Sequence, residues 1–94
     1  MNKHILLIID NQMNPGKYSK DQLRQNASEA ADTFDADDYF ATAYYANDAV
    51  FEAADAAADN AADYVVYYWI DQYFVETGES KQDYIDEINK ENKQ

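Results

Sequence analysis

Residues 43–70 read AYYANDAVFEAADAAADNAADYVVYYWI, and their alanines and acids recur with a helical period. The acids follow one another at spacings of three and four, which at 100° per residue places them on one face of an α-helix. The opposite face carries mainly alanines, so the pattern predicts an amphipathic helix that a neighbouring helix can approach closely. The members of this acidic face are Asp48, Glu52, Asp55, Asp59 and Asp63.

The length of this helix depends on where the chain breaks. Residues 17–77 contain no glycine and no proline. One helix over forty residues would span about 60 Å, so we expect a break at residues 35–38, where Asp35 can cap a helix. A second break near residues 59–60 is an alternative, but the periodicity runs through it. The sequence therefore predicts one long acidic amphipathic helix that continues to about Val75, with residues 64–75 apolar nearly all round and surrounded by partners.

Local signals define the elements before this helix. Asn14-Pro15-Gly16 predicts a turn, because proline fixes φ and glycine supplies the positive φ that follows. Ser19 with Gln22 matches a capping box, which predicts a helix over residues 20–33.

Similar signals define the elements after it. Gly78 is suited to end a helix, and Ser80 with Asp83 is suited to begin the next one. We expect a short final helix over residues 81–89 and a frayed tail at residues 90–94.

Two runs are rich in β-branched or aromatic residues, namely residues 4–9 and 64–70. A two-stranded unit by itself is only marginally stable, and the alanine-rich approach to Tyr64 favours a helix there. We therefore predict an all-α, small helical bundle in a single domain over residues 1–94. A strand over residues 4–9 remains the alternative.

Composition excludes several classes of function. The chain has 94 residues, 19 Asp and Glu, seven Lys and Arg, a net charge of −12, no cysteine and one histidine. This charge is unsuited to binding nucleic acids or anionic membranes directly. The lack of cysteine excludes thiolate metal sites and disulfides. We expect no catalytic residues, no metal and no cofactor, a packed or surface role for His4, and a cytoplasmic location.

The acids are segregated from the bases. Residues 25–80 contain thirteen Asp and Glu but no Lys or Arg. Solubility needs a net charge of only about 2–8 in a small domain, so this segregation suggests a function. The hypothesis is that the acidic face imitates a DNA backbone in the basic cleft of a DNA-binding protein. Two alternatives stay open: a scaffold or neutralising protein that binds a basic partner with no DNA site, and a merely solvated helix face.

Spacing indicates that one helix is not enough for such mimicry. Five carboxylates over about 22 Å give one charge per 5–6 Å, against 3.4 Å on each DNA strand. A second acidic helix or a second subunit would have to supply another row, so a homodimer is an option. The further candidates for the partner-binding surface are Glu29, Asp32, Asp35 and Asp38, with Tyr44 and Tyr45 as anchors beside the acidic face.

Most of the chain resembles small acidic proteins of tailed bacteriophages. The residues that carry this likeness are NPGKYSKDQLRQNA at 14–27, the Ala/Tyr/Asp tract, YWIDQYF at 68–74, Thr77-Gly78-Glu79 and Asp83-Tyr84. The segment Ala57-Ala58-Asp59-Asn60-Ala61, with aromatics downstream, is also similar to the Ocr-type anti-restriction DNA mimics. This second resemblance implies a dimeric helical decoy that blocks a host defence enzyme, such as a restriction, CRISPR or other nuclease, in the bacterial cytoplasm. The chain differs from that family in being shorter and in carrying Lys near both ends.

Overall fold

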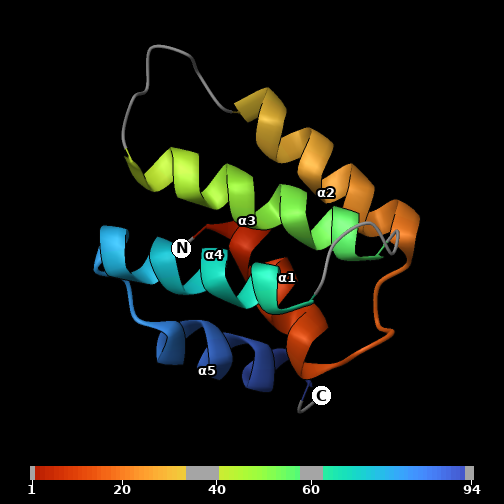
Figure 1. The fold of residues 1–94 in the computed structure, drawn as a ribbon. Coiled ribbons are helices and arrows are strands. Elements are labelled where there is room, and N and C mark those ends of the chain that lie inside the picture. Colours follow the sequence, from red (N-terminus) through yellow and green to blue (C-terminus); the bar gives the residue numbers. More distant parts are fainter. Residues whose placement is uncertain (1, 34–40, 58–62, 93–94) are drawn as a thin grey trace.

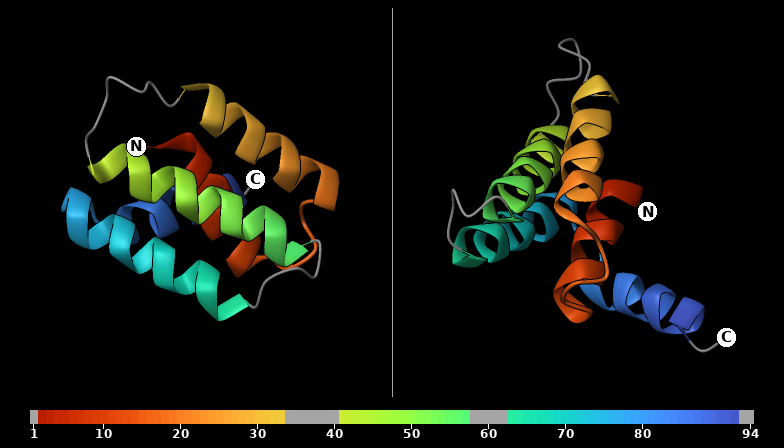
Figure 2. Two further views of the ribbon diagram at one scale, coloured as in Figure 1. Left: turned by 45° about the horizontal axis from the view of Figure 1, so that its top comes forward. Right: turned by 90° about the vertical axis from the view of Figure 1, so that its right-hand side faces the viewer.

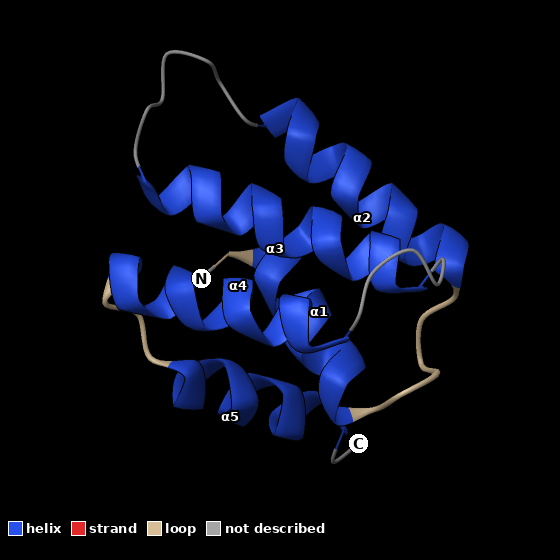
Figure 3. Cartoon of the chain, viewed as in Figure 1, coloured by secondary structure: helices blue, strands red, loops and turns tan. Residues whose placement is uncertain are grey.

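The computed structural model describes the backbone of residues 2–33, 41–57 and 63–92, and the side chains of residues 2–31, 48–56 and 64–91. These residues form helices α1 (Lys3–Met13), α2 (Lys20–Thr33), α3 (Ala41–Ala57), α4 (Asp63–Thr77) and α5 (Lys81–Asn92) (Figure 1). The described part of the chain contains helices and loops but no strand (Figure 3). The predicted all-α fold is confirmed.

Helix α3 lies between α2 and α4 and contacts both (Figure 1). Helix α4 runs antiparallel to α3, and α1 packs against α2, α3 and α5. In the right-hand view of Figure 2, α3 and α4 lie on one side of α1 and α5 lies on the other. The molecule therefore has an α3–α4 layer whose outer side is not covered by another described helix.

Residues 4–9 form part of α1, so the strand alternative is wrong. The side chain of Asn2 caps this helix, since its Oδ1 accepts hydrogen bonds from the amides of His4 at 2.9 Å and Ile5 at 3.2 Å. Ile5, Ile8 and Ile9 follow the helical spacing of three and four residues and are all buried. Their combined burial outweighs the mild preference of isoleucine for strands.

The prediction of one long helix up to Val75 is wrong, because α3 ends at Ala57 and α4 begins at Asp63. The two helices pack against each other, and Val50 and Ala53 of α3 enter the same buried core as Val66 and Ile70 of α4. A straight helix would leave these side chains in water, so folding back is favoured. The alternative break at residues 59–60 and the expected break at residues 35–38 both lie outside the described residues.

The predicted cap of α2 is confirmed. Ser19 Oγ accepts a hydrogen bond from the Gln22 amide at 3.1 Å, and Gln22 Oε1 accepts one from the Ser19 amide at 2.7 Å. This reciprocal pair is the capping box that the spacing predicts. The preceding turn also forms: the amide of Lys17 donates to the carbonyl of Asn14 at 3.1 Å, and Gly16 has a φ of 88°.

The end of α4 also agrees with its sequence signal. Gly78 has a φ of 71° and donates its amide to the carbonyl of Phe74 at 3.0 Å, as a residue that terminates a helix does. Helix α5 is longer than expected. It continues through Asn92, so residues 90–92 are helical rather than frayed.

Candidate interaction surface

Three of the predicted acids come together on α3. Asp48, Glu52 and Asp55 follow at spacings of four and three residues and are all half-buried; we call this group the α3 acidic face. Partial burial raises the pKa of the Glu52 carboxyl, and the negative charges of Asp55 and Asp48 raise it further. The carboxylate of Glu52 therefore lies close enough to those of Asp48 and Asp55 to be repelled by both.

The remaining two members of the predicted face do not extend it along the same helix. Asp59 lies outside the described residues, and Asp63 is the first residue of α4 rather than a later turn of α3. The expectation of five carboxylates along one helix is therefore wrong. The physical reason is that the apolar faces of α3 and α4 are buried against each other, so the two segments pack as separate antiparallel helices.

The other predicted acids and tyrosines are only partly described. Glu29 is exposed on α2, where its carboxylate accepts a hydrogen bond from Gln25 Nε2 at 3.2 Å. Asp32 belongs to α2, and Tyr44 and Tyr45 belong to the first turns of α3, but their side chains lie outside the described residues. Asp35 and Asp38 lie outside the described residues as well. Their contribution to a partner-binding surface stays a prediction.

Basic residues are confined to the other elements. Neither residues 41–57 of α3 nor residues 63–77 of α4 include a Lys or Arg. Two of the bases are engaged locally: Lys17 Nζ lies 2.7 Å from Asp10 Oδ2, and Arg24 lies 3.7 Å from Asp21. The α3–α4 layer is therefore negative, while positive charge is carried by α1, α2, α5 and the loop before α2.

Three tyrosines and one valine are exposed on α4. The exposed fractions are 75% for Tyr64, 48% for Tyr67, 56% for Tyr68 and 72% for Val75. We call these four residues the α4 aromatic stripe. The expectation that this segment is surrounded by partners is wrong, because only the face that carries Val66, Ile70 and Tyr73 is buried.

A signal for this stripe is present in the sequence. Asp71 is exposed between the aromatic positions, seven residues after Tyr64 and four before Val75, so it belongs to the same helix face. A charged residue on the same helix face as aromatic residues indicates that this face is exposed to water. The mainly apolar composition of residues 64–75 makes this single charge easy to overlook.

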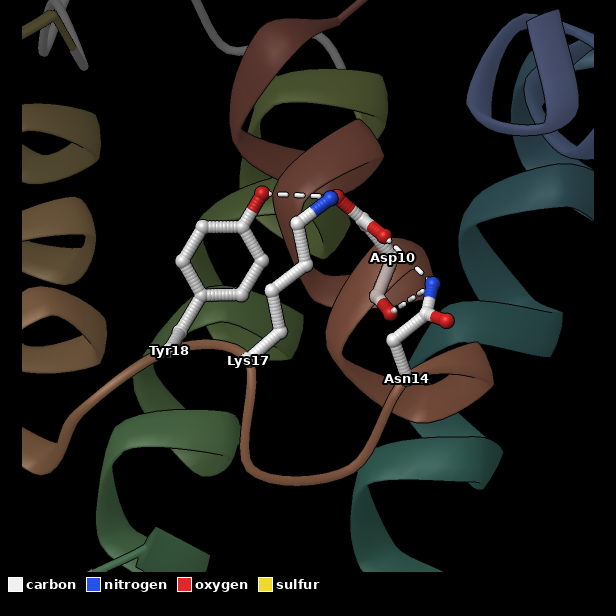
Figure 4. A network of polar contacts seen from close by, with 4 residues as sticks. All are labelled: Asp10, Asn14, Lys17 and Tyr18. Atoms are coloured by element: carbon white, nitrogen blue, oxygen red, sulfur yellow. Dashed lines mark hydrogen bonds and ion pairs between the residues drawn. The ribbon is translucent and has the colours of Figure 1, made fainter. Parts of the chain in front are cut away.

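Sequence reasoning missed a network around Asp10, which is buried at the end of α1 (Figure 4). Its carboxylate accepts hydrogen bonds from Lys17 Nζ at 2.7 Å, from the Tyr18 hydroxyl at 2.7 Å and from Asn14 Nδ2 at 2.8 Å. Burial alone would raise the pKa of Asp10, but these hydrogen bonds and the charge of Lys17 outweigh burial and lower it below 3.8. Burial and the hydrogen bond to Asp10 raise the pKa of Tyr18 to about 12. The network ties the loop before α2 to α1.

A second network joins α4, α5 and the start of the chain. The carboxylate of Glu79 accepts hydrogen bonds from the hydroxyls of Tyr73, at 2.7 Å, and Tyr84. The Tyr84 hydroxyl in turn accepts a hydrogen bond from the amide of Asn2 at 2.9 Å. Burial raises the pKa of both tyrosines, and the hydrogen bonds to Glu79 add to this effect. Both networks have the geometry of structural clamps.

His4 is a packed residue of α1. Its Nδ1 lies 2.9 Å from Asn26 Oδ1, and Asn26 Nδ2 donates to the His4 carbonyl at 3.2 Å. Because the amide nitrogen of Asn26 donates to His4, its oxygen is left to accept the Nδ1 proton. The pair fastens α1 to α2, and both residues are among the buried polar residues of the core.

A cavity of about 260 Å³ opens where α1, α3 and α4 approach the Pro15–Gly16 turn. Its described lining includes Gln12, Ala53, Val66 and Tyr67 and no Asp, Glu, Lys, Arg or His. Within the side chains that the structure describes, no three His, Asp or Glu residues gather to hold a metal ion.

None of the helices in the described ranges is long and apolar enough to cross a membrane.

The described geometry thus offers two adjacent elements for binding, an acidic face on α3 and an aromatic stripe on α4, and two internal polar clamps. Comparison with known proteins adds no relative: the chain matches no family model, no curated protein and no solved structure.

Proposed function

We propose that this protein is a DNA-mimic inhibitor, which binds the basic DNA-binding cleft of a host defence enzyme through the α3–α4 layer. One observation carries the proposal: α3 and α4 pack side by side and contain acids but no bases. A layer of one sign attracts a surface of the opposite sign over a distance of about 10 Å at 0.1 M salt. The ordinary ligand of a strongly basic cleft is the phosphate backbone of a nucleic acid.

The charge spacing on α3 supports this proposal if more than one helix contributes. Asp48 and Asp55 are seven residues apart, so the three carboxylates of the α3 acidic face extend over about 10 Å of helix. This is close to one charge per 5 Å, sparser than the 3.4 Å of one DNA strand. Glu29 and Asp32 of the neighbouring α2 would supply the second row.

The test is capture of partners from a bacterial lysate on the immobilised full chain. Bound proteins are eluted first with a salt gradient and then, on a parallel column, with duplex DNA. A DNA-binding enzyme released by duplex DNA is the expected result. Retention of a partner that duplex DNA cannot release would contradict mimicry.

A matched pair of variants assigns the binding to the α3 acidic face. The variant Asp48→Asn/Glu52→Gln/Asp55→Asn removes three charges from α3, and Asp86→Asn/Glu87→Gln/Glu91→Gln removes three from α5. We expect the α3 variant to bind the captured enzyme at least about tenfold more weakly, because charge complementarity governs the encounter. The α5 variant should bind within about twofold of the unmodified chain. Equal losses in both variants would show a response to net charge rather than to this face.

A second candidate function is favoured by the α4 aromatic stripe, since a DNA backbone has no counterpart for exposed aromatic rings. In that case the protein neutralises or scaffolds a basic protein that has no DNA site. The same column separates the two functions, because duplex DNA would leave such a partner bound.

A further inference from the structure

We propose that the α4 aromatic stripe is a docking surface for an arginine-bearing amphipathic helix of a protein partner. This inference rests on the proposed function in one respect, namely that the partner is basic. It adds a different contact surface and a different chemistry, because the stripe contributes apolar area and aromatic faces rather than a row of carboxylates.

The stripe is a continuous ridge along one side of α4. Tyr64, Tyr68 and Val75 follow at spacings of four and seven residues, and each exposes more than half of its surface. Tyr67 adds a neighbouring position that is 48% exposed. Isolated exposed apolar residues are ordinary on a protein surface, whereas four large ones along one helix face mark an interaction site.

The side of α4 opposite the stripe is packed into the core. Val66, Ile70 and Tyr73 on the opposite side of α4 are buried in the core. Tyr68 also packs edge to face on Trp69, with ring centroids 5.4 Å apart and an angle of 81° between the rings. Because α4 is anchored by its buried side, its backbone loses little conformational entropy on binding, and tyrosine is a residue type that is enriched at interface hot spots.

Charge indicates what kind of helix fits this ridge. The exposed Asp71 lies within the stripe, the exposed Glu76 lies close to its end, and α4 has no base. Arginine can pair with these carboxylates and also stack on tyrosine rings, which attract cations through their faces. The apolar side of an amphipathic helix would cover the rings while its arginines reach the carboxylates.

A second copy of the chain is a poorer occupant. Two copies of the stripe would place two Asp71 carboxylates near each other with no base on either α4. Each copy also carries a net charge of −12, so pairing would be opposed at low salt.

The probe is a synthetic amphipathic peptide of about 18 residues, or five helical turns, with leucines on one face and arginines beside them. Binding to the full chain is measured by calorimetry at two salt concentrations. The test variant is Tyr64→Ser/Tyr68→Ser, and Met13→Ser, which alters an exposed apolar residue of α1, is the matched control. Circular dichroism verifies that each variant remains helical.

We expect the tyrosine variant to bind the peptide at least about tenfold more weakly and the Met13 variant to bind it unchanged. A scrambled peptide of the same composition should bind at least about tenfold more weakly, because it lacks an apolar face. Replacing its arginines by lysines should weaken binding severalfold. Equal binding of the scrambled peptide, or unchanged binding by the tyrosine variant, would overturn the proposal.

Two further outcomes distinguish this inference from self-association of the chain and from DNA mimicry. Sedimentation that shows dimers of the unmodified chain and monomers of the tyrosine variant would assign the stripe to self-association and overturn the proposal. If duplex DNA fails to release the captured partner while the tyrosine variant still loses the peptide, DNA mimicry is wrong and the docking surface stands.

Discussion

At the residue scale, Asp10 is a buried carboxylate at the centre of a polar network. It is 3% exposed and accepts hydrogen bonds from Asn14, Lys17 and Tyr18. A buried carboxylate needs such partners, because burial without them costs several kcal/mol. Asp10 therefore helps to fix the loop between α1 and α2, together with the turn at Asn14–Lys17 and the packing of Tyr18 against the core.

Replacing Asp10 by Asn should lower the free energy of unfolding by about 2 kcal/mol, because charged hydrogen bonds to Lys17 and Tyr18 are lost inside a buried site. Urea denaturation at pH 7 measures the change. Asp21→Asn is the control, since its ion pair with Arg24 is exposed and worth less than about 0.5 kcal/mol. Equal changes in both variants would contradict the assignment.

Tyr18 predicts how stability depends on alkaline pH. Its pKa is raised from 10.0 to about 12, so the folded state favours the neutral phenol. The associated stability is fully present below pH 10 and is lost as the pH rises to 12, because the unfolded chain ionises first. Tyr18→Phe should remove this part of the loss while lowering stability by about 1 kcal/mol at pH 7. Urea denaturation at pH 9 and pH 11 measures the free energy of unfolding at each pH. If the variant loses as much stability between these two pH values as the unmodified chain does, the prediction is wrong.

Asp10 gives the corresponding behaviour in acid. Its pKa is lowered in the folded state, so its contribution is present above the unfolded value of 3.8 and is lost as the pH falls below that value.

At the scale of elements, the helix boundaries that depend on local chemistry are predictable from the sequence. The start of α2 at Lys20 follows from the Ser19–Gln22 box, and the end of α4 follows from Gly78. The break between α3 and α4 is not predictable in this way. It depends on burying Val50 and Ala53 with Val66 and Ile70, and these contacts form only once the helices have folded back on each other.

In the candidate site, too, the features that depend on local spacing are predictable from the sequence, and those that depend on tertiary packing are not. The closeness of Asp48, Glu52 and Asp55 follows from helical spacing, which the sequence contains. The exposure of Tyr64 and Tyr68 depends on which face of α4 meets α3 and the core, and composition alone suggested burial. Asp10 was not predicted at all, because its partners approach through the turn at Pro15–Gly16.

Within α3, Glu52 should be a destabilising residue at neutral pH. Its pKa is raised by partial burial and by Asp55 and Asp48, so its favourable contribution exists only in acid and is lost as the pH rises through the folded pKa. Glu52→Gln should raise the free energy of unfolding by about 0.3–0.6 kcal/mol at pH 7. The substitution removes the charge of Glu52 and with it two repulsive like-charge pairs on the helix. The gain should vanish near pH 4. A loss of stability at pH 7 would contradict the proximity of the three carboxylates.

At the scale of the whole molecule, the net charge of −12 opposes compaction, and the opposition is strongest in the α3–α4 layer. Charge of one sign on one side repels itself in the folded state more than in the expanded chain. The fold retains this layer in spite of the cost, so burial elsewhere in the molecule has to offset the repulsion.

Sodium chloride should therefore stabilise the protein. Raising it from about 0.05 M to 0.5 M shortens the screening length from above 10 Å to below 5 Å, and the melting temperature should rise by several degrees. Thermal unfolding followed by circular dichroism measures the shift. The variant with three charges removed from α3 should show a smaller rise than the unmodified chain, and an equal rise would place the repulsion elsewhere.

The contact between Asn2 and Tyr84 has a consequence for synthesis of the chain. Helix α1 emerges from the ribosome before the other helices that the structure describes, yet its isoleucine face is enclosed only after α2, α3 and α5 are in place. At a translation rate of about 5–20 residues per second, Tyr84 is synthesised roughly 4–16 seconds after Ile5, Ile8 and Ile9. A nascent chain that stalls before α5 would present this apolar face to chaperones and to other nascent chains.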